Sequence, residues 1–187
     1  AHIIGAMQTV ISRQVDLTAN PAVITVGAIK GGIRHNIIPE RVEFLGTMRT
    51  FTEEQRARAI AGLQLIGEKT AAASGAKATL TMETPRYPVT YNDPALTERM
   101  LPSLRRVAGE DKVLNMNLIT GAEDFSFYQK QVPGLFFFVG STPANQDAFK
   151  APSNHSDYFF VDEASIPIAT RALTQVAVDF LEGTGNR

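Results

Sequence analysis

Residues 31–50 read GGIRHNIIPERVEFLGTMRT, and this stretch decides the fold. Two glycines end an apolar segment, a polar turn follows, and an alternating segment begins after Pro39. Alternation with a period of two predicts a β-strand with two unlike faces. One face is expected to carry Val42, Phe44, Gly46 and Met48. The stretch therefore predicts a β-hairpin with a polar connection.

Two polar side chains of this hairpin are candidates for ligand binding. Asn36 lies in the connection, and Arg49 lies 13 residues later at the end of the second strand. An amide and a planar guanidinium suit a carboxylate, because the guanidinium can donate two parallel hydrogen bonds to it. Taken alone, the two residues indicate only that the hairpin has a polar face.

The segments around the hairpin predict a helix–strand–strand–helix–strand order. The expected ranges are a helix over 1–17, strands over 22–29 and 41–50, a helix over 52–75 and a strand over 78–84. Thr52 and Gln55 have the spacing of a capping box, in which each side chain reaches a backbone N–H group of the other residue. The second helix is expected to bury Ile60, Leu63, Ile66 and Ala73. This order is a ferredoxin-like βαββαβ unit without its first strand.

The start of the chain favours the same interpretation. Ala1 is not an initiator methionine, and the first helix has no side chain that could cap its free N–H groups. We expect the sequence to be a piece of a longer protein, and an end left by cloning or a lost tag is the alternative.

Pro85 and Pro88 mark the expected boundary between two domains. Beyond them, a helix is predicted over 93–107, with Pro102 kinking or interrupting it. The apolar run LFFFVGS over 135–141 is typical of a strand that is buried on both faces.

Residues 142–159 show no period, and a loop of that length is usually functional or disordered. A last helix is expected from residue 162 or 165 to Gly183. Its packed side is predicted to comprise Ile166, Ala169, Leu173, Val176 and Phe180.

Composition excludes several classes of protein. The chain of 187 residues has 44% hydrophobic and 20% charged residues and a net charge of −1, so it lacks the basic footprint of a nucleic-acid binder. No run approaches the roughly 20 apolar residues of a membrane span. The absence of cysteine excludes disulfides and thiolate metal sites within the chain, and it is compatible with the cytoplasmic location that we expect.

Few side chains can carry chemistry. Glu123 and Asp124 follow Gly121 and can face a cation, although they can equally be the acidic start of a short helix. His155 lies in the long loop, where a lone histidine is more often solvated than bound to a metal. By these residues alone, the chain has no complete active site.

The order of three motifs resembles the M20 family of metal-dependent peptidases and amidohydrolases. NIIPERVEFLGTMRTF (36–51) resembles its N-V-I-P and G-T-x-R-T-F stretch. GAEDFSFYQKQVPGLFFFVG (121–140) and APSNHSDYFFVDEASIP (151–167) resemble segments of its hippurate hydrolase and indole-acetyl-amino-acid hydrolase branch. Ala122 and Asp157 depart from the family pattern, where glycine and proline are usual.

The resemblance implies an α/β (α+β) fold with two parts. Residues 1–85 resemble an inserted ferredoxin-like dimerisation (lid) domain whose first strand is missing. Residues 86–187 resemble the C-terminal part of a zinc-peptidase-like α/β/α catalytic domain. The N-terminal catalytic part, with the general base and most metal ligands, is implied to lie outside this chain.

The resemblance also assigns roles to four residues. His155 matches a metal ligand, and Asn36 and Arg49 match residues that bind substrate in the active site of a partner subunit. Glu123 matches a position that lines the site. No catalytic residue is implied within this chain, because the general base belongs to the absent part.

These matches imply a metal-dependent amidohydrolase that cleaves the amide bond of N-acyl amino acids or related conjugates. Two divalent metal ions, of zinc, manganese or nickel, are implied for the complete enzyme, together with a homodimer formed by the inserted domain. No nucleic-acid or membrane partner is expected. The alternatives are an M20 dipeptidase, deacetylase or carbamoyl hydrolase, and a non-catalytic dimerisation module.

Overall fold

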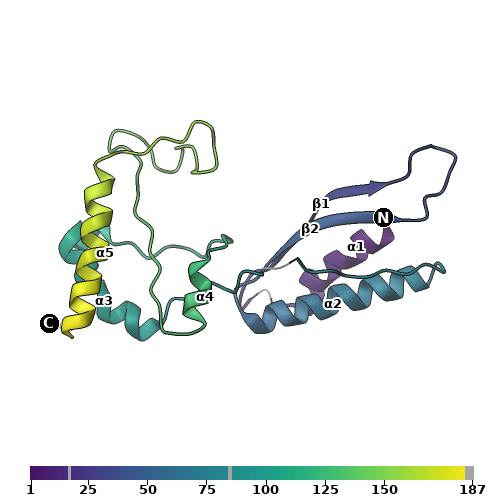
Figure 1. Cartoon of the computed structure of the whole chain (residues 1–187), viewed down its shortest axis with the longest axis horizontal. Coiled ribbons are helices and arrows are strands. Elements are labelled where there is room, and N and C mark those ends of the chain that lie inside the picture. Colours follow the sequence, from purple (N-terminus) through teal and green to yellow (C-terminus); the bar gives the residue numbers. More distant parts are fainter. Residues whose placement is uncertain (17, 84–85, 184–187) are drawn as a thin grey trace. The chain divides into compact units, whose positions relative to one another are not determined.

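The computed structural model describes residues 1–16, 18–83 and 86–183, and the chain divides into two compact units (Figure 1). Unit 1 comprises residues 1–90 and 119–127, and unit 2 comprises residues 91–118 and 128–187. The chain therefore returns to unit 1 once after leaving it. The assignment of a lid domain and a catalytic part to the two halves of the chain stays a prediction.

The predicted hairpin forms in unit 1. Strand β1 (Val23–Gly31) pairs antiparallel with strand β2 (Val42–Arg49), and a β-bulge lies between Val26 and Ala28. Gly32 follows β1 with a φ of 75°, a conformation that glycine adopts without a steric penalty. The hairpin and the ends of its strands are thus confirmed to within two residues.

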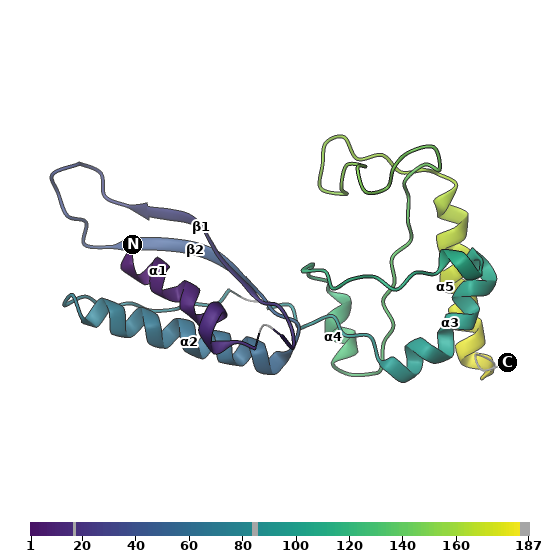
Figure 2. The same cartoon turned by 180° about the vertical axis from the view of Figure 1, so that it is seen from behind.

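Two helices cover one face of the hairpin, as Figures 1 and 2 show. They are α1 (His2–Thr9), which continues as a π-helical turn over Val10–Gln14, and α2 (Glu53–Ala72). The buried residues at their contact are Met7, Val10, Ala59 and Leu63. Phe44 and Met48 of β2 pack against this cluster, so the predicted inner face of the strand is confirmed.

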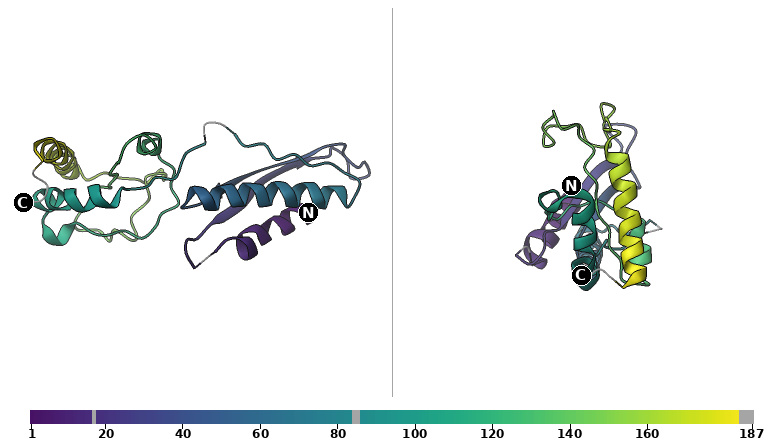
Figure 3. Two further views of the ribbon diagram at one scale, coloured as in Figure 1. Left: turned by 90° about the horizontal axis from the view of Figure 1, so that it is seen from below. Right: turned by 90° about the vertical axis from the view of Figure 1, so that its left-hand side faces the viewer.

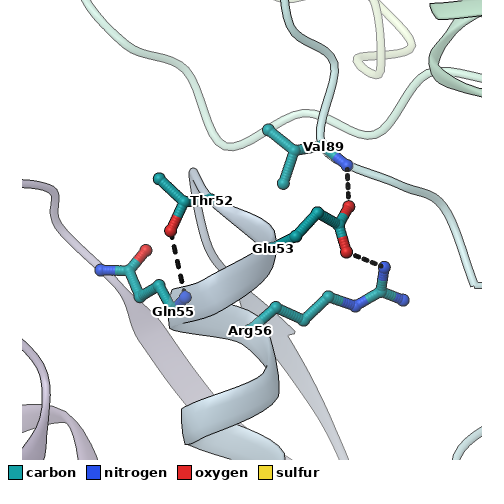
Figure 4. Close-up of polar contacts among 5 residues, drawn as sticks. All are labelled: Thr52, Glu53, Gln55, Arg56 and Val89. Carbon is teal, nitrogen blue, oxygen red and sulfur yellow. Dashed lines mark hydrogen bonds and ion pairs between the residues drawn. The ribbon is translucent and has the colours of Figure 1, made fainter. Parts of the chain in front are cut away.

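One half of the predicted capping box is confirmed at the start of α2. The Thr52 hydroxyl accepts a hydrogen bond from the Gln55 N–H at 3.0 Å (Figure 4). The Gln55 side chain does not complete the box, because its oxygen accepts from the Phe51 N–H at 3.1 Å and its nitrogen donates to the Asn20 carbonyl at 2.7 Å. Gln55 therefore links the helix to the segment that precedes β1.

The buried stripe of α2 differs from the prediction. Leu63 is buried as expected, but Ile60 is only half-buried and Ala73 is exposed at the end of the helix. Small residues take the buried places instead, and a Cβ atom on Gly62 would lie 3.1 Å from a methyl group of Val10. Close approach of the π-helical turn selects glycine and alanine over larger apolar side chains.

The third strand predicted in this half is wrong for residues 78–83, which form neither helix nor strand; residue 84 lies outside the described residues. Leu80 of this segment nevertheless packs against the core cluster. In a βαββαβ sheet the last strand pairs with the first. The described residues supply no strand at that place, and the segment has no ladder partner.

Unit 2 is built on two helices that pack against each other (Figure 3). Helix α3 (Pro94–Ala108) is followed by a short 3₁₀ turn (Glu110–Lys112), and α5 (Ser165–Glu182) ends the unit. Asp93 caps α3 by accepting the Leu96 N–H at 2.8 Å. Within the described residues, no helix is long and apolar enough to cross a membrane.

Pro102 lies inside α3, which runs without interruption from Pro94 to Ala108, and the kink expected as the other possibility stays a prediction. A proline inside a helix removes one backbone hydrogen bond. Met100 and Ser103 beside it are completely buried, and this packing offsets the lost bond.

The packed face of α5 also differs from the prediction. Ile166, Leu173 and Phe180 are exposed, whereas Ala172 and Asp179 are buried. Asp179 is buried and forms an ion pair with Arg106 of α3, whose side chain is half-exposed. Three residues of the expected stripe are therefore exposed, whereas Ala169 and Val176 are half-buried, and the Arg99 guanidinium lies over the Phe180 ring, 4.9 Å from its centroid.

The apolar run over 135–141 forms no strand, and Phe138 is half-exposed, so the prediction of a strand buried on both faces is wrong. The Asn92 side chain binds both backbone groups of Phe136, with nitrogen-to-oxygen distances of 2.7 Å for each bond. Gln129 of the short helix α4 (Phe125–Gln129) donates to the same Asn92 oxygen at 3.2 Å. An amide side chain thus takes the place of a neighbouring strand.

Candidate functional site

Arg49 is the last residue of β2, and its guanidinium donates a hydrogen bond to the carbonyl of Thr120. Thr120 stands directly before the GAEDF turn over 121–125, and both segments belong to unit 1. The structure therefore brings Arg49 to the stretch that contains Glu123. This contact could not be predicted from the local sequence pattern, because it joins residues that are 71 positions apart.

Glu123 is half-buried and precedes α4. Its backbone carbonyl accepts hydrogen bonds from the Ser126 N–H at 3.2 Å and from the Ser126 hydroxyl at 2.5 Å. Ser126 is buried, with 1% of its surface exposed, so this turn is locally well fixed. Asp124 is exposed, and its carbonyl accepts the Phe127 N–H at 3.0 Å. A short helix does start here, as the alternative interpretation of the two acidic residues expected.

Asn36 lies far from Arg49 within the chain. It is exposed in the connection between β1 and β2, beyond Val42, whereas Arg49 ends the same strand. A strand rises about 3.3 Å per residue, so the seven steps of β2 separate its two ends by roughly 23 Å. The two residues of one chain therefore do not meet on one small carboxylate ligand.

Three isoleucines surround Asn36 in the same connection. Ile33 and Ile38 are almost completely exposed, and Ile37 is half-exposed. The Ile37 N–H bonds to the Arg34 carbonyl at 3.4 Å, which forms a single turn at the tip. The connection thus presents three exposed isoleucines beside the polar side chains of Arg34, His35 and Asn36.

His155 is exposed in unit 2, in a turn where the Ser156 N–H bonds to the Ser153 carbonyl at 2.9 Å. The surrounding residues 142–159 form turns but neither helices nor strands, which confirms the predicted irregular loop. Ser156 also accepts the Tyr158 N–H through its hydroxyl at 3.2 Å. These local bonds shape the loop around the imidazole.

The donor set of the chain does not make a metal site by itself. Among the described residues, no group of three or more His, Cys, Asp or Glu side chains is placed to hold a metal ion. Structural and catalytic zinc sites in proteins use three or four protein ligands. His155 can therefore supply one ligand to a site that the described residues do not complete.

Comparison with known proteins assigns the chain to a family. The profile of Peptidase family M20/M25/M40 matches residues 7–179, which is most of the sequence. The chain belongs to the M20 family. Both the metal-dependent peptidases and the amidohydrolases that the three motifs resemble are therefore its relatives.

Two curated M20 relatives illustrate the range of the family. The chain is 30% identical to "Thermostable carboxypeptidase 2" of Saccharolobus solfataricus, over 96% of its own length and 44% of the relative. It is also 30% identical to "IAA-amino acid hydrolase ILR1-like 4" of Arabidopsis thaliana, over 97% of its length and 41% of the relative. The chain thus spans less than half the length of these M20 proteins.

A solved M20 structure agrees with the fold. The YXEP protein of Bacillus subtilis, described as a dinuclear metal-binding peptidase of the M20 family, superposes with a TM-score of 0.72 at 26% identity. The match covers 97% of this chain and 45% of that protein. The mixed α/β structure described above therefore corresponds to part of an M20 protein.

Proposed function

We propose that this chain is the lid and C-terminal part of a metal-dependent M20 amidohydrolase that cleaves the amide bond of N-acyl amino acids or related conjugates. The observation that carries the proposal is the family match over residues 7–179, together with the relative that hydrolyses IAA–amino acid conjugates by its name. The GAEDF and NHSD segments add support, because they resemble motifs of that branch apart from Ala122 and Asp157. The chain is proposed to act only with the portion of the M20 fold that it does not match.

Arg49 is proposed to bind the carboxylate of the conjugate. A guanidinium has five N–H donors, and the bond to Thr120 uses one of them, so donors remain for a carboxylate. Positioning of a substrate in this way can lower the activation barrier by several kcal/mol. The upper limit, from well-oriented intramolecular reactions, is about 7–11 kcal/mol.

Asn36 is proposed to reach the same ligand from a second copy of the chain. Because the two residues lie at opposite ends of β2, a ligand that contacts both needs one residue from each protomer. The exposed isoleucines of the tip support this, since an apolar surface on a projecting loop favours burial against another surface. A homodimer is therefore part of the proposal.

Two divalent ions are proposed for the complete enzyme, because the B. subtilis relative is described as dinuclear. His155 would supply one neutral imidazole, a ligand that suits zinc, manganese or nickel. Glu123 is proposed to line the site rather than to act as its base. A cytoplasmic location is proposed as well, since a chain without cysteine needs no oxidising compartment.

The test measures hydrolysis of hippurate and N-acetyl-L-leucine, compared with dipeptides, by the proposed full-length enzyme with added Mn²⁺ or Zn²⁺. We expect turnover of the N-acyl substrates, and Arg49→Ala should raise KM or lower kcat/KM for these anionic conjugates. An unchanged kcat/KM in the Arg49→Ala variant would contradict the assigned role. Preference for dipeptides would favour the dipeptidase alternative.

A non-catalytic dimerisation module is the second candidate. It is favoured by the lack of a group of three metal-ligating side chains among the described residues. Titration of the 187-residue chain with Zn²⁺ tests a premise that both candidates share, namely that this chain alone does not hold a complete metal site. Weak binding, sensitive to His155→Ala, is expected, whereas tight stoichiometric uptake would show a site that neither candidate includes.

A further inference from the structure

The corner between β2 and α2, residues 49–53, contacts two segments that come much later in the chain. At one end of the corner, Arg49 donates to the Thr120 carbonyl. At the other end, one Glu53 oxygen accepts the Val89 N–H at 3.2 Å, and the second lies 3.6 Å from Arg56 (Figure 4). All of these residues belong to unit 1.

The GAEDF turn has a contact on each side, to Arg49 of this corner before it and to Tyr87 after it. Thr120 precedes the turn and is bound by Arg49. Phe127 follows it and packs on Tyr87, with ring centroids 5.9 Å apart and an interplanar angle of 53°. Tyr87 stands two residues before Val89, the residue that Glu53 holds. A turn fixed at both ends has little freedom to move its central residues.

Glu123 occupies the centre of this turn. Its carbonyl is held by Ser126, and its Cα lies at most about 11 Å from that of Thr120, since extended chain spans no more than roughly 3.6 Å per residue. Arg49 therefore contacts the backbone three residues before Glu123, on the segment that leads into the turn.

We propose that Arg49 is a positioning residue for Glu123 in its own chain, through the carbonyl of Thr120. This role is separate from carboxylate binding, because it uses a donor that points at the protein. The contact between Arg49 and Thr120 does not depend on any enzymatic activity. Only its effect on substrate binding rests on the proposed function. One arginine then links the strand that carries it to the turn that carries the carboxylate.

The test measures amide hydrogen exchange by NMR in the 187-residue chain, with Arg49→Met and Arg49→Lys variants. The reporters are the N–H groups of Ser126 and Phe127, which bond within the turn. We expect roughly five- to tenfold faster exchange of both amides in Arg49→Met, as for the loss of one hydrogen bond. Arg49→Lys should restore slow exchange, since its ammonium group can still donate to Thr120.

A spectroscopic signature separates this contact from a general structural effect. The ¹³C shift of the Thr120 carbonyl should move in Arg49→Met and return in Arg49→Lys. Arg41→Met is the matched control, because Arg41 is an exposed arginine that pairs with Glu43 near the other end of β2. It should change neither reporter.

Three outcomes would overturn the proposal. They are unchanged exchange of Ser126 and Phe127 in Arg49→Met, an equal effect of Arg41→Met, and an equal rise at the buried Leu63 amide of α2. None of these depends on catalysis. If the protein fails to hydrolyse N-acyl amino acids but shows the expected exchange pattern, the positioning role of Arg49 stands and only the proposed function is rejected.

Discussion

Replacing Asn92 with alanine should destabilise unit 2 more than any exposed polar substitution there. The Asn92 amide binds the N–H and the carbonyl of Phe136, each at 2.7 Å, and accepts from Gln129 at 3.2 Å. In Asn92→Ala all three hydrogen bonds are lost, and the backbone groups of Phe136 lose their partner. The apolar run that contains Phe136 would then be free to leave the start of α3.

The expected magnitude follows from these contacts. A hydrogen bond contributes a net of about 0.5–1.5 kcal/mol to stability, so three bonds give an upper range of roughly 1.5–4.5 kcal/mol. The site is only partly buried, and water can replace some of the lost partners. We therefore expect a loss of about 1.5–3 kcal/mol, a large share of the roughly 5–15 kcal/mol that stabilises an ordinary domain.

Urea unfolding followed by circular dichroism measures this loss, because the chain has no tryptophan for fluorescence. With a denaturant slope of about 1–3 kcal/mol per molar, the unfolding midpoint should fall by roughly 1 M. Asn115→Ala is the control, since Asn115 is exposed in the same unit. It should shift the midpoint by little.

A second variant makes the reasoning refutable. In Asn92→Asp a carboxylate oxygen replaces the amide nitrogen that donates to the Phe136 carbonyl, so two acceptors would face each other. Asn92→Asp should therefore be at least as unstable as Asn92→Ala at neutral pH. Stability of Asn92→Ala equal to that of Asn115→Ala would refute the role of Asn92.

Three further predictions concern other parts of the chain. Gly46→Ala should destabilise the hairpin by about 1–3 kcal/mol in thermal unfolding, because a Cβ atom there would lie 2.3 Å from the Thr25 carbonyl oxygen. The pKa of Asp16 lies below its ordinary value because the Thr18 hydroxyl, and then backbone N–H groups, donate to it. Its contribution to stability is therefore present well above pH 3.8 and is lost as the pH falls through the lowered pKa, and Asp16→Asn should remove this acid dependence in unfolding scans. The isolated chain should self-associate in light scattering, and Leu173→Gln, on the exposed stripe of α5, should reduce this association.

Each of these predictions has a control or an opposing result. Gly27→Ala should be tolerated better than Gly46→Ala, because nothing lies within 4 Å of a Cβ atom at Gly27. If the loss of stability at low pH persists in Asp16→Asn, it arises from other carboxyl groups. Thr174→Gln, at an exposed polar position of the same helix, should leave the association unchanged.

Local pattern predicted the elements whose stability depends on near neighbours in sequence. The alternation of residues 41–50 gave the inner face of β2 correctly, since side-chain direction in a strand has a fixed period. The hydroxyl of Thr52 and the glycine at 183 gave helix ends correctly, because caps act within one turn. The three motifs that resemble M20 proteins gave the family, which the profile match confirmed.

Pairing and packing between distant segments could not be predicted. The apolar segments at 78–83 and 135–141 have strand-like composition, but a strand needs a neighbour with free backbone groups, and composition does not say whether one is present. The predicted packed face of α5 was wrong for a related reason. Asp179 is buried where it pairs with Arg106 of α3, and the pattern of apolar residues does not contain this contact between distant segments.

The same division applies to the candidate site. The sequence by itself determined the family and the residue types at Asn36, Arg49, Glu123 and His155. Only the tertiary structure decided which of them meet, because distances depend on how β2 runs and where the chain returns. It separates Asn36 from Arg49 by the length of a strand, and it brings Arg49 to the turn of Glu123 through the carbonyl of Thr120.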